Sequence, residues 1–129
     1  MTTAHPAVLS LAKDLSKEPP RSPRVRIGGF ALLARAIDKC RAYLAGTLGE
    51  YSHGCPVDMV LLDYKKVTLG DFRERVALGS SYEEIGEWLT IEGRPMSADE
   101  IKAWSDELES RGFFERLEAS DAVDFPAVA

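Results

Sequence analysis

Apolar residues recur at helical spacing through most of this 129-residue chain. The clearest series lies three or four residues apart, as on one face of an amphipathic helix. It runs through Phe30, Leu33, Ile37, Cys40 or Arg41, and Leu44. The spacing predicts a helix over residues 30–45, and Gly46 is a suitable residue to end it.

The second half of the sequence predicts several short helices with defined starts. Pro56 suits a first helical turn and predicts a helix over residues 59–64, and Thr68 opens another that ends near residue 78. In that helix we expect three apolar residues to face inward: Phe72, Val76 and Leu78.

Two further helices share one pattern. Ser81-x-x-Glu84-Ile85-x-x-Trp88 is repeated as Ser97-x-x-Glu100-Ile101-x-x-Trp104. A serine followed three residues later by glutamate is a capping box, which satisfies free N–H groups at a helix start. A duplicated helical hairpin would explain the repeat, but such boxes are common, and we favour independent capping.

No stretch of residues alternates between apolar and polar as a half-buried strand would. The predicted fold class is therefore all-α: a compact bundle of a long central helix and several short capped helices, with an extended proline-rich loop. We expect a flexible N-terminal arm over residues 1–13, one helical domain over 14–118 and a poorly structured tail over 119–129.

Composition narrows the class of protein. With 45% hydrophobic and 29% charged residues the chain resembles a soluble globular protein. It contains no apolar run of the roughly 20 residues that span a bilayer, and its first residues do not resemble a secretory signal. Two cysteines, Cys40 and Cys55, are too few for a disulfide scaffold, which favours a reduced, cytoplasmic protein.

Charge is divided unevenly along the chain. Of the net charge of −5, residues 1–58 carry +3 and residues 59–129 carry −8. An acidic protein is a poor general ligand for duplex nucleic acid, since affinity there comes mainly from phosphate neutralisation. A helix-turn-helix over residues 68–91 is disfavoured for the same reason, because its second helix carries three glutamates.

The basic stretch over residues 17–29 is the first candidate site. Three prolines and two glycines give it an extended path, and it carries four cations: Lys17, Arg21, Arg24 and Arg26. Guanidinium groups bind carboxylate or phosphate with two parallel hydrogen bonds, and a stiff loop loses little entropy on binding. The alternative is that these arginines pair with acids on the later helices and fix the loop in place.

The second candidate is Lys39 and Arg41 with Glu50 and Tyr51. Lys39 follows Arg35 by four residues, so two cations share a helix face and require an anion or a carboxylate nearby. Glu50 would supply that carboxylate, or would act as a general base if burial raised its pKa. We favour the structural interpretation.

The third candidate is His53-Gly-Cys55-Pro56-x-Asp58. Cys55 at a helix start, with His53 and Asp58 nearby, has the residue types of a nucleophilic or metal site. A tetrahedral structural metal site needs four ligands, and the set is incomplete, so we expect no metal and no cofactor. A buried cysteine and an aspartate that satisfies backbone N–H groups are favoured.

Five aromatic residues at helical spacing are expected in the core: Phe72, Trp88, Trp104, Phe113 and Phe114. Any exposed part of these faces would suit a partner or a homo-oligomer.

Several motifs together resemble a known family. They are the segment from Asp14 to Gly29, Asp38-Lys-Cys-Arg-Ala, Ala-Gly-Thr-Leu-Gly-Glu-Tyr and Cys-Pro-Val-Asp. The chain resembles, from Asp14 to about Asp58 and more weakly to Trp88, a bacterial family described only as domain of unknown function 5069. The resemblance implies a small, soluble, largely helical bacterial protein and supplies no activity.

We therefore expect a binding or regulatory module that recognises a small anion or an acidic segment of a partner protein. Arg21, Arg24 and Arg26 would carry the charge, with Lys39 and Arg41 as further contributors. The alternative is a small enzyme, with a pocket formed by Glu50, Tyr51, Cys55, Asp58 and the loop arginines. We expect no duplex nucleic acid and no membrane among its partners.

Overall fold

Seven α-helices make up the regular structure of the computed structural model, which describes residues 3–126. Within these residues the β-structure is one isolated bridge between Ile27 and Phe30, so the predicted all-α class is confirmed. The helices are α1 (Pro6–Leu11), α2 (Leu33–Ala45), α3 (Pro56–Lys65), α4 (Leu69–Ala77), α5 (Tyr82–Ile91), α6 (Ala98–Glu109) and α7 (Phe113–Asp124).

The predicted starts of α4, α5 and α6 are confirmed by their side-chain caps, whereas α3 begins at Pro56, three residues before the predicted start, and has no side-chain cap. The Ser81 hydroxyl accepts from the Glu84 N–H at 3.1 Å, and the Glu84 carboxylate accepts from the Ser81 N–H at 2.8 Å. Ser97 and Glu100 form the same reciprocal pair at the start of α6. Local sequence therefore fixes where these helices begin, because each cap needs residues only three positions apart.

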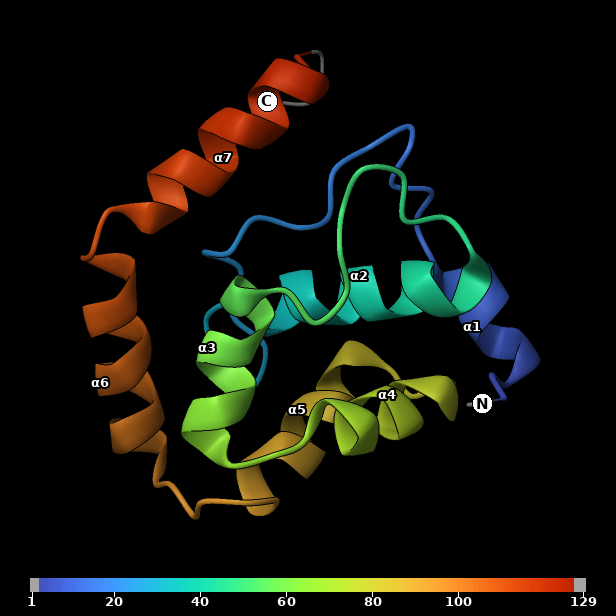
Figure 1. Ribbon diagram of the computed structural model, residues 1–129. Helices are drawn as coiled ribbons and strands as arrows, with labels where there is room; N and C mark the ends of the chain where they lie inside the picture. Colours follow the sequence, from blue (N-terminus) through green and yellow to red (C-terminus); the bar gives the residue numbers. More distant parts are fainter. Residues whose placement is uncertain (1–2, 127–129) are drawn as a thin grey trace.

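Helix α2 lies through the middle of the molecule, with α3 and α6 on one side of it and α4 and α5 below in Figure 1. Its first ten residues, from Leu33 to Ala42, are all buried. Its 13 residues barely exceed the 12 of α6 and of α7, so the predicted long central helix is not confirmed.

The start of α2 differs from the prediction. Ile27 and Phe30 exchange backbone hydrogen bonds across Gly28 and Gly29, which adopt φ of 59° and 85°, so the helix begins at Leu33 rather than Phe30. A Cβ on Gly28 would lie 3.3 Å from the backbone of Gly86, so the turn packs directly on α5. The glycines are required both by the positive φ and by this close approach.

The core is formed where α2 meets α3–α6 and the start of α7. Its largest fully buried apolar side chains include Phe30, Leu32, Leu33, Ile37, Leu61, Leu62, Phe72, Ile85, Leu89 and Phe114. Trp88, Trp104 and Phe113 pack against this cluster while remaining partly exposed. No helix among residues 3–126 has the length and apolar character that crossing a bilayer requires.

Two predictions about individual segments are wrong. Leu78 is 61% exposed, because it follows Val76 by two residues and so leaves the buried face of α4. The expected unstructured tail is helical as far as Asp124, and only its last residues, 127–129, lie outside the part described. Contacts with distant residues, which are invisible in the local sequence, hold this helix.

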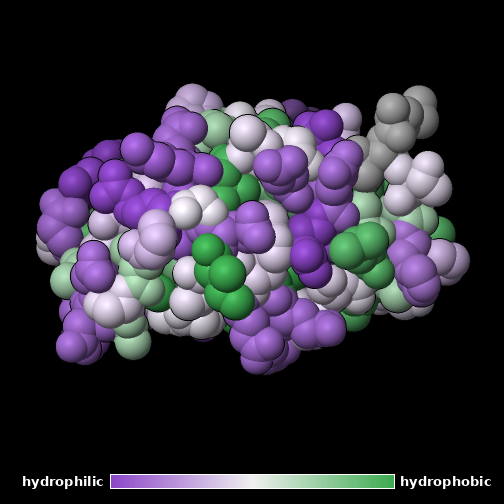
Figure 2. Space-filling model, turned by 90° about the horizontal axis from the view of Figure 1, so that it is seen from below, coloured by the Kyte–Doolittle hydropathy of each residue, from purple (hydrophilic) through white to green (hydrophobic). Residues whose placement is uncertain are grey.

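The N-terminal arm is partly helical, and Val8 is its one buried residue among residues 3–13. Val8 is fully buried, whereas Leu9 and Leu11 are 65% and 43% exposed. On the face shown in Figure 2, apolar side chains form small areas separated by polar ones. The expected homo-oligomer stays a prediction.

Candidate functional site

The basic loop is fixed to α6 by a buried serine. The Ser105 hydroxyl donates to the Gly29 carbonyl at 2.9 Å and accepts from the Ala31 N–H at 3.0 Å. Ser105 is fully buried. Because both contacts are made to loop backbone, this side chain sets where the arginines just before Gly28 can reach.

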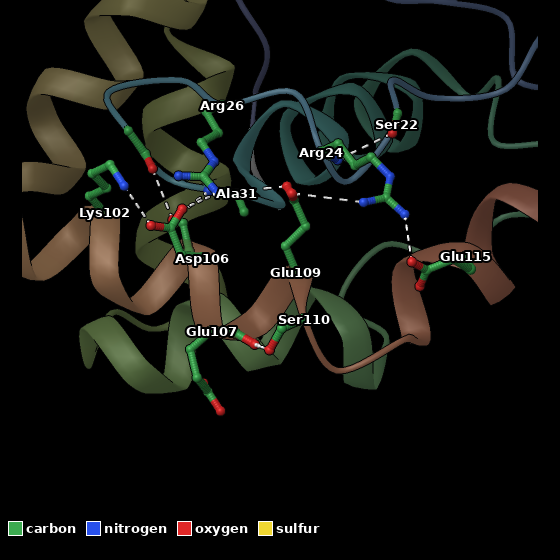
Figure 3. A network of polar contacts seen from close by, with 12 residues as sticks. Ser22, Arg24, Arg26, Ala31, Lys102, Asp106, Glu107, Glu109, Ser110 and Glu115 are labelled. Carbon is green, nitrogen blue, oxygen red and sulfur yellow. Dashed lines mark hydrogen bonds and ion pairs between the residues drawn. The ribbon is translucent and has the colours of Figure 1, made fainter.

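Arg24 contacts three carboxylates from two helices. Its Nε lies 2.9 Å from Glu118. One Nη lies 2.9 Å from Glu115 and the other lies 3.8 Å from Glu109 (Figure 3). The Ser22 hydroxyl donates to the same Glu118 carboxylate at 2.8 Å. One loop residue therefore joins the end of α6 to the first turns of α7.

Arg26 continues this network along α6. Its guanidinium lies 2.8 Å from Asp106 and 3.6 Å from Glu109 (Figure 3). Lys102 also contacts Asp106, and the hydrogen bonds from Lys102 and then Arg26 lower the pKa of that carboxyl group. The interpretation that loop arginines pair with acids on later helices describes Arg24 and Arg26 in this structure.

Arg21 and Lys17, in contrast to Arg24 and Arg26, form no ion pair with α6 or α7. Arg21 is exposed, its guanidinium lies 4.8 Å from the centre of the Tyr82 ring, and within residues 3–126 no carboxylate lies at ion-pair distance from it. The Arg21 backbone N–H donates to the buried Asp38 carboxylate at 2.8 Å. Lys17 projects into solvent with an 81% exposed side chain.

Arg35, which is buried, forms a two-point contact with a carboxylate of α7. Its two Nη atoms lie 2.9 and 3.0 Å from the two carboxylate oxygens of Asp121 on α7. The Tyr51 hydroxyl donates to the same carboxylate at 2.7 Å. Burial, and then the hydrogen bond to Asp121, raise the pKa of Tyr51, so it remains a donor at neutral pH.

A second buried ion pair lies one turn along α2. The Lys39 ammonium lies 3.0 Å from Asp58 and 3.0 Å from the Cys55 sulfur, and the side chains of Lys39 and Asp58 are each only 4% exposed. Asp58 also accepts from the Gly54 N–H at 2.9 Å, as expected of an aspartate that satisfies backbone groups. Burial raises the pKa of Asp58, and the Lys39 charge opposes that rise.

These pairs correct the predicted role of Glu50. The carboxylates beside Arg35 and Lys39 are Asp121 and Asp58, whereas Glu50 is exposed. Spacing along the helix identified the need for anions, but their source depended on how distant segments fold back. Arg41, the other predicted cation of α2, is buried and donates to the Ser80 carbonyl at 3.0 Å, with its guanidinium over Tyr82.

His53 contacts Arg73 and Cys55 contacts Lys39, so the two residues do not form a nucleophile–base pair. The His53 Nε2 accepts from Arg73 at 3.2 Å, and its buried Nδ1 has no hydrogen-bond partner among residues 3–126. Burial, with the charges of Arg73 and Lys39, lowers the pKa of His53 to about 4. Cys55 is the N-cap residue of α3, as predicted, but its side chain accepts no capping hydrogen bond. Across residues 3–126 no group of three or more potential ligands is placed to hold a metal ion.

Two cavities are lined in part by residues of α7 and by the residue that follows it. The first, of about 350 Å³, is lined by Lys13, Glu18, Pro19, Pro20, Arg21, Ser22, Glu118 and Asp121. The second, of about 240 Å³, is lined by Leu15, Ser16, Gly49, Glu50, Tyr51, Asp124 and Phe125. Cys55 and Asp58 line neither cavity, so the residues of the predicted enzyme pocket are divided among separate places.

The residues that sequence reasoning missed are the partners rather than the arginines. Ser22, Ser105 and Asp121 were not identified, and Arg35 was noted only as a like-charged neighbour of Lys39. That neighbour relation was the available signal for Arg35. Asp121 lies in the segment expected to be a tail, and nothing in its local sequence distinguishes it from other surface acids.

Comparison with known protein families finds a match that includes almost all of the residues described above. Residues 17–124 match the family described as domain of unknown function (DUF5069). The chain belongs to this family. The match confirms the resemblance seen in the first half and extends it past Trp104 through α6 and α7, so the acidic partners of the arginines lie inside the DUF5069 region. No curated protein matches the chain.

Proposed function

We propose that this DUF5069 protein is a binding module that recognises acidic protein segments through the guanidinium groups of its N-terminal loop. The observation that carries the proposal is the contact of Arg24 with Glu109, Glu115 and Glu118. A single stiff loop residue here recognises carboxylates on two helices, which is the chemistry that an acidic partner segment would use.

Accessibility supports recognition of a partner. The Arg24 and Arg26 side chains remain 35% and 27% exposed while contacting their carboxylates. Arg21 is exposed, and no carboxylate of the described residues lies at ion-pair distance from it. The prolines that stiffen the loop reduce the entropy lost when a partner binds. The loop therefore presents a held row of guanidinium groups at the surface.

An acidic segment fits this row better than a small free anion does. The cavity beside Arg21 also contains the carboxylates of Glu18, Glu118 and Asp121, which would repel a small anion. A segment with several carboxylates can replace the internal carboxylates as a set, so each arginine keeps a partner.

The cytoplasmic location expected from the sequence stays a prediction.

The test uses the full chain and a labelled helical peptide rich in glutamate, with a matched glutamine peptide. In the Asp106→Asn/Glu109→Gln variant, Arg26 loses both of its internal carboxylates and Arg24 loses one. We expect fluorescence anisotropy to show at least about tenfold tighter binding of the acidic peptide to this variant than to the wild type, which corresponds to 1.4 kcal/mol.

The control is Glu83→Gln/Glu87→Gln, which removes the same charge from exposed positions of α5. It should leave binding unchanged, and adding Arg24→Gln and Arg26→Gln to the first variant should remove the gain. Equal binding of the acidic and glutamine peptides, or a gain in the α5 control as large as in the first variant, would contradict the proposed function.

A further inference from the structure

Helix α7 is attached to the molecule in two different ways along its length. At its start Phe114 is fully buried, and Gly112 just before it has φ of 88°, so the helix is anchored there after a sharp turn. Beyond Phe114 no residue of α7 is fully buried, and Val123 is 81% exposed. In Figure 1 this part of α7 extends over the N-terminal loop, away from α4 and α5.

Polar contacts hold that outer part. Glu118 is held by Arg24 and by Ser22, while Asp121 is held by Arg35 and by Tyr51. The stacking of Phe125 on Tyr51, with 6.5 Å between ring centres, adds one apolar contact. The cavity of about 350 Å³ lies alongside Glu118 and Asp121, so packing beneath this helix is incomplete.

Glu118 and Asp121 lie three residues apart and therefore on one helix face. Each meets one guanidinium group and one hydroxyl group, all of which come from the loop, α2 and the segment after α2. The receiving groups thus form two carboxylate positions at the spacing of Glu-x-x-Asp. Arg35 is 4% exposed, so this is a built position rather than a chance surface contact.

We propose that these two positions are a receptor for an acidic helical segment of a partner protein, and that α7 is its resident occupant, which the partner must displace. This inference rests on the proposed function and names both its ligand and its regulation. The Arg35–Tyr51 position recognises the aspartate of Glu-x-x-Asp, and the Arg24–Ser22 position recognises the glutamate.

Because Arg35 is charged, a partner can displace α7 only by exchanging one carboxylate for another. A buried guanidinium left without a carboxylate is strongly unfavourable, so α7 leaves only when another carboxylate takes its place. Because α7 is tethered, it competes at an effective concentration on the order of millimolar. The wild-type chain should therefore bind a free segment weakly, and neutralising α7 should reveal the receptor.

The probe is a labelled peptide with the sequence of residues 113–126, and the protein is the full-length Glu118→Gln/Asp121→Asn variant. We expect the peptide to bind this variant at least about tenfold tighter than the wild type, a difference of 1.4 kcal/mol. A peptide with asparagine at the position of Asp121 should lose that gain. The control variant Asp124→Asn removes an exposed charge of the same helix and should bind like the wild type.

A second measurement needs no variant of the protein. In the wild-type chain, a millimolar concentration of the acidic peptide should speed hydrogen exchange of the α7 amides, whereas the asparagine peptide should not. This comparison decides the question if the double variant fails to fold. Unchanged α7 exchange would then overturn the inference.

The outcomes separate the two proposals. If the Glu118→Gln/Asp121→Asn variant binds both peptides equally or binds neither, while the Asp106→Asn/Glu109→Gln variant binds the glutamate-rich peptide, the receptor beneath α7 is wrong and the proposed function stands. If neither variant binds any acidic peptide, both proposals are wrong.

Discussion

The Lys39–Asp58 pair allows a quantitative test of the buried charges between α2 and α3. Both side chains are 4% exposed, and their charged atoms lie 3.0 Å apart. Lys39 and Gly54 donate to different oxygens of Asp58, so Asp58→Asn keeps an acceptor for only one of them. It also removes the charge, which leaves a buried ammonium group uncompensated. We expect a loss of about 3–5 kcal/mol in the free energy of unfolding at pH 7. That is a large part of the about 5–15 kcal/mol typical of a whole domain.

Replacing Lys39 instead of Asp58 gives a variant whose stability depends differently on pH. Lys39→Met leaves Asp58 buried without its cation, and since burial already raises the pKa of Asp58, removal of Lys39 raises it further. The folded state then binds a proton more tightly than the unfolded state. Stability of this variant relative to the wild type therefore rises as pH falls from neutral toward 3.8, the ordinary pKa of an aspartate. Asp58→Asn has no carboxyl group there and shows no such recovery.

Urea unfolding followed by fluorescence of Trp88 and Trp104 measures both effects. In the Lys39→Met/Asp58→Asn double variant neither unpaired charge remains, so the loss should be smaller than the sum of the single losses by about 2 kcal/mol. Losses at pH 7 that add to within about 0.5 kcal/mol would show that the two groups act independently and would refute the reasoning.

Three further predictions follow from single residues. Gly93 and Gly46 both have positive φ, but a Cβ on Gly93 would lie 1.9 Å from a backbone oxygen of α3, whereas one on Gly46 meets nothing within 4 Å. Gly93→Ala should cost at least about 3 kcal/mol and Gly46→Ala about 1, and equal losses in urea unfolding would contradict this steric account. Since the pKa of His53 is lowered to about 4, wild-type stability should fall as pH decreases from 6.5 toward 4. His53→Gln should lose about 1–2 kcal/mol less over that range, and parallel pH profiles would exclude His53 as the cause. Ser105→Ala should cost about 2 kcal/mol through its two backbone contacts, against almost nothing for the exposed Ser120→Ala in thermal unfolding.

The sequence alone determined the features that depend on neighbours along the chain. Helical spacing predicted α2 to within three residues of its start, and the capping boxes placed the starts of α5 and α6 at Ser81 and Ser97. The proline-rich stretch predicted an extended path from residue 14 to residue 29, where no helix forms. Caps and periodicity involve residues at most four positions apart, and a sequence displays them directly.

The carboxylates that pair with the buried cations could not be identified from neighbouring positions in the sequence. The like-charged pair of Arg35 and Lys39 showed that carboxylates were needed, but Glu50, the nearby acid, is not one of them. Asp121 reaches Arg35 from 86 residues away, on a helix expected to be a tail. The chain carries 21 acidic residues, and their short-range surroundings do not distinguish those that meet an arginine from those that meet water. Only the packing of α6 and α7 across the basic loop decides this, because an ion pair depends on distance in space rather than along the chain.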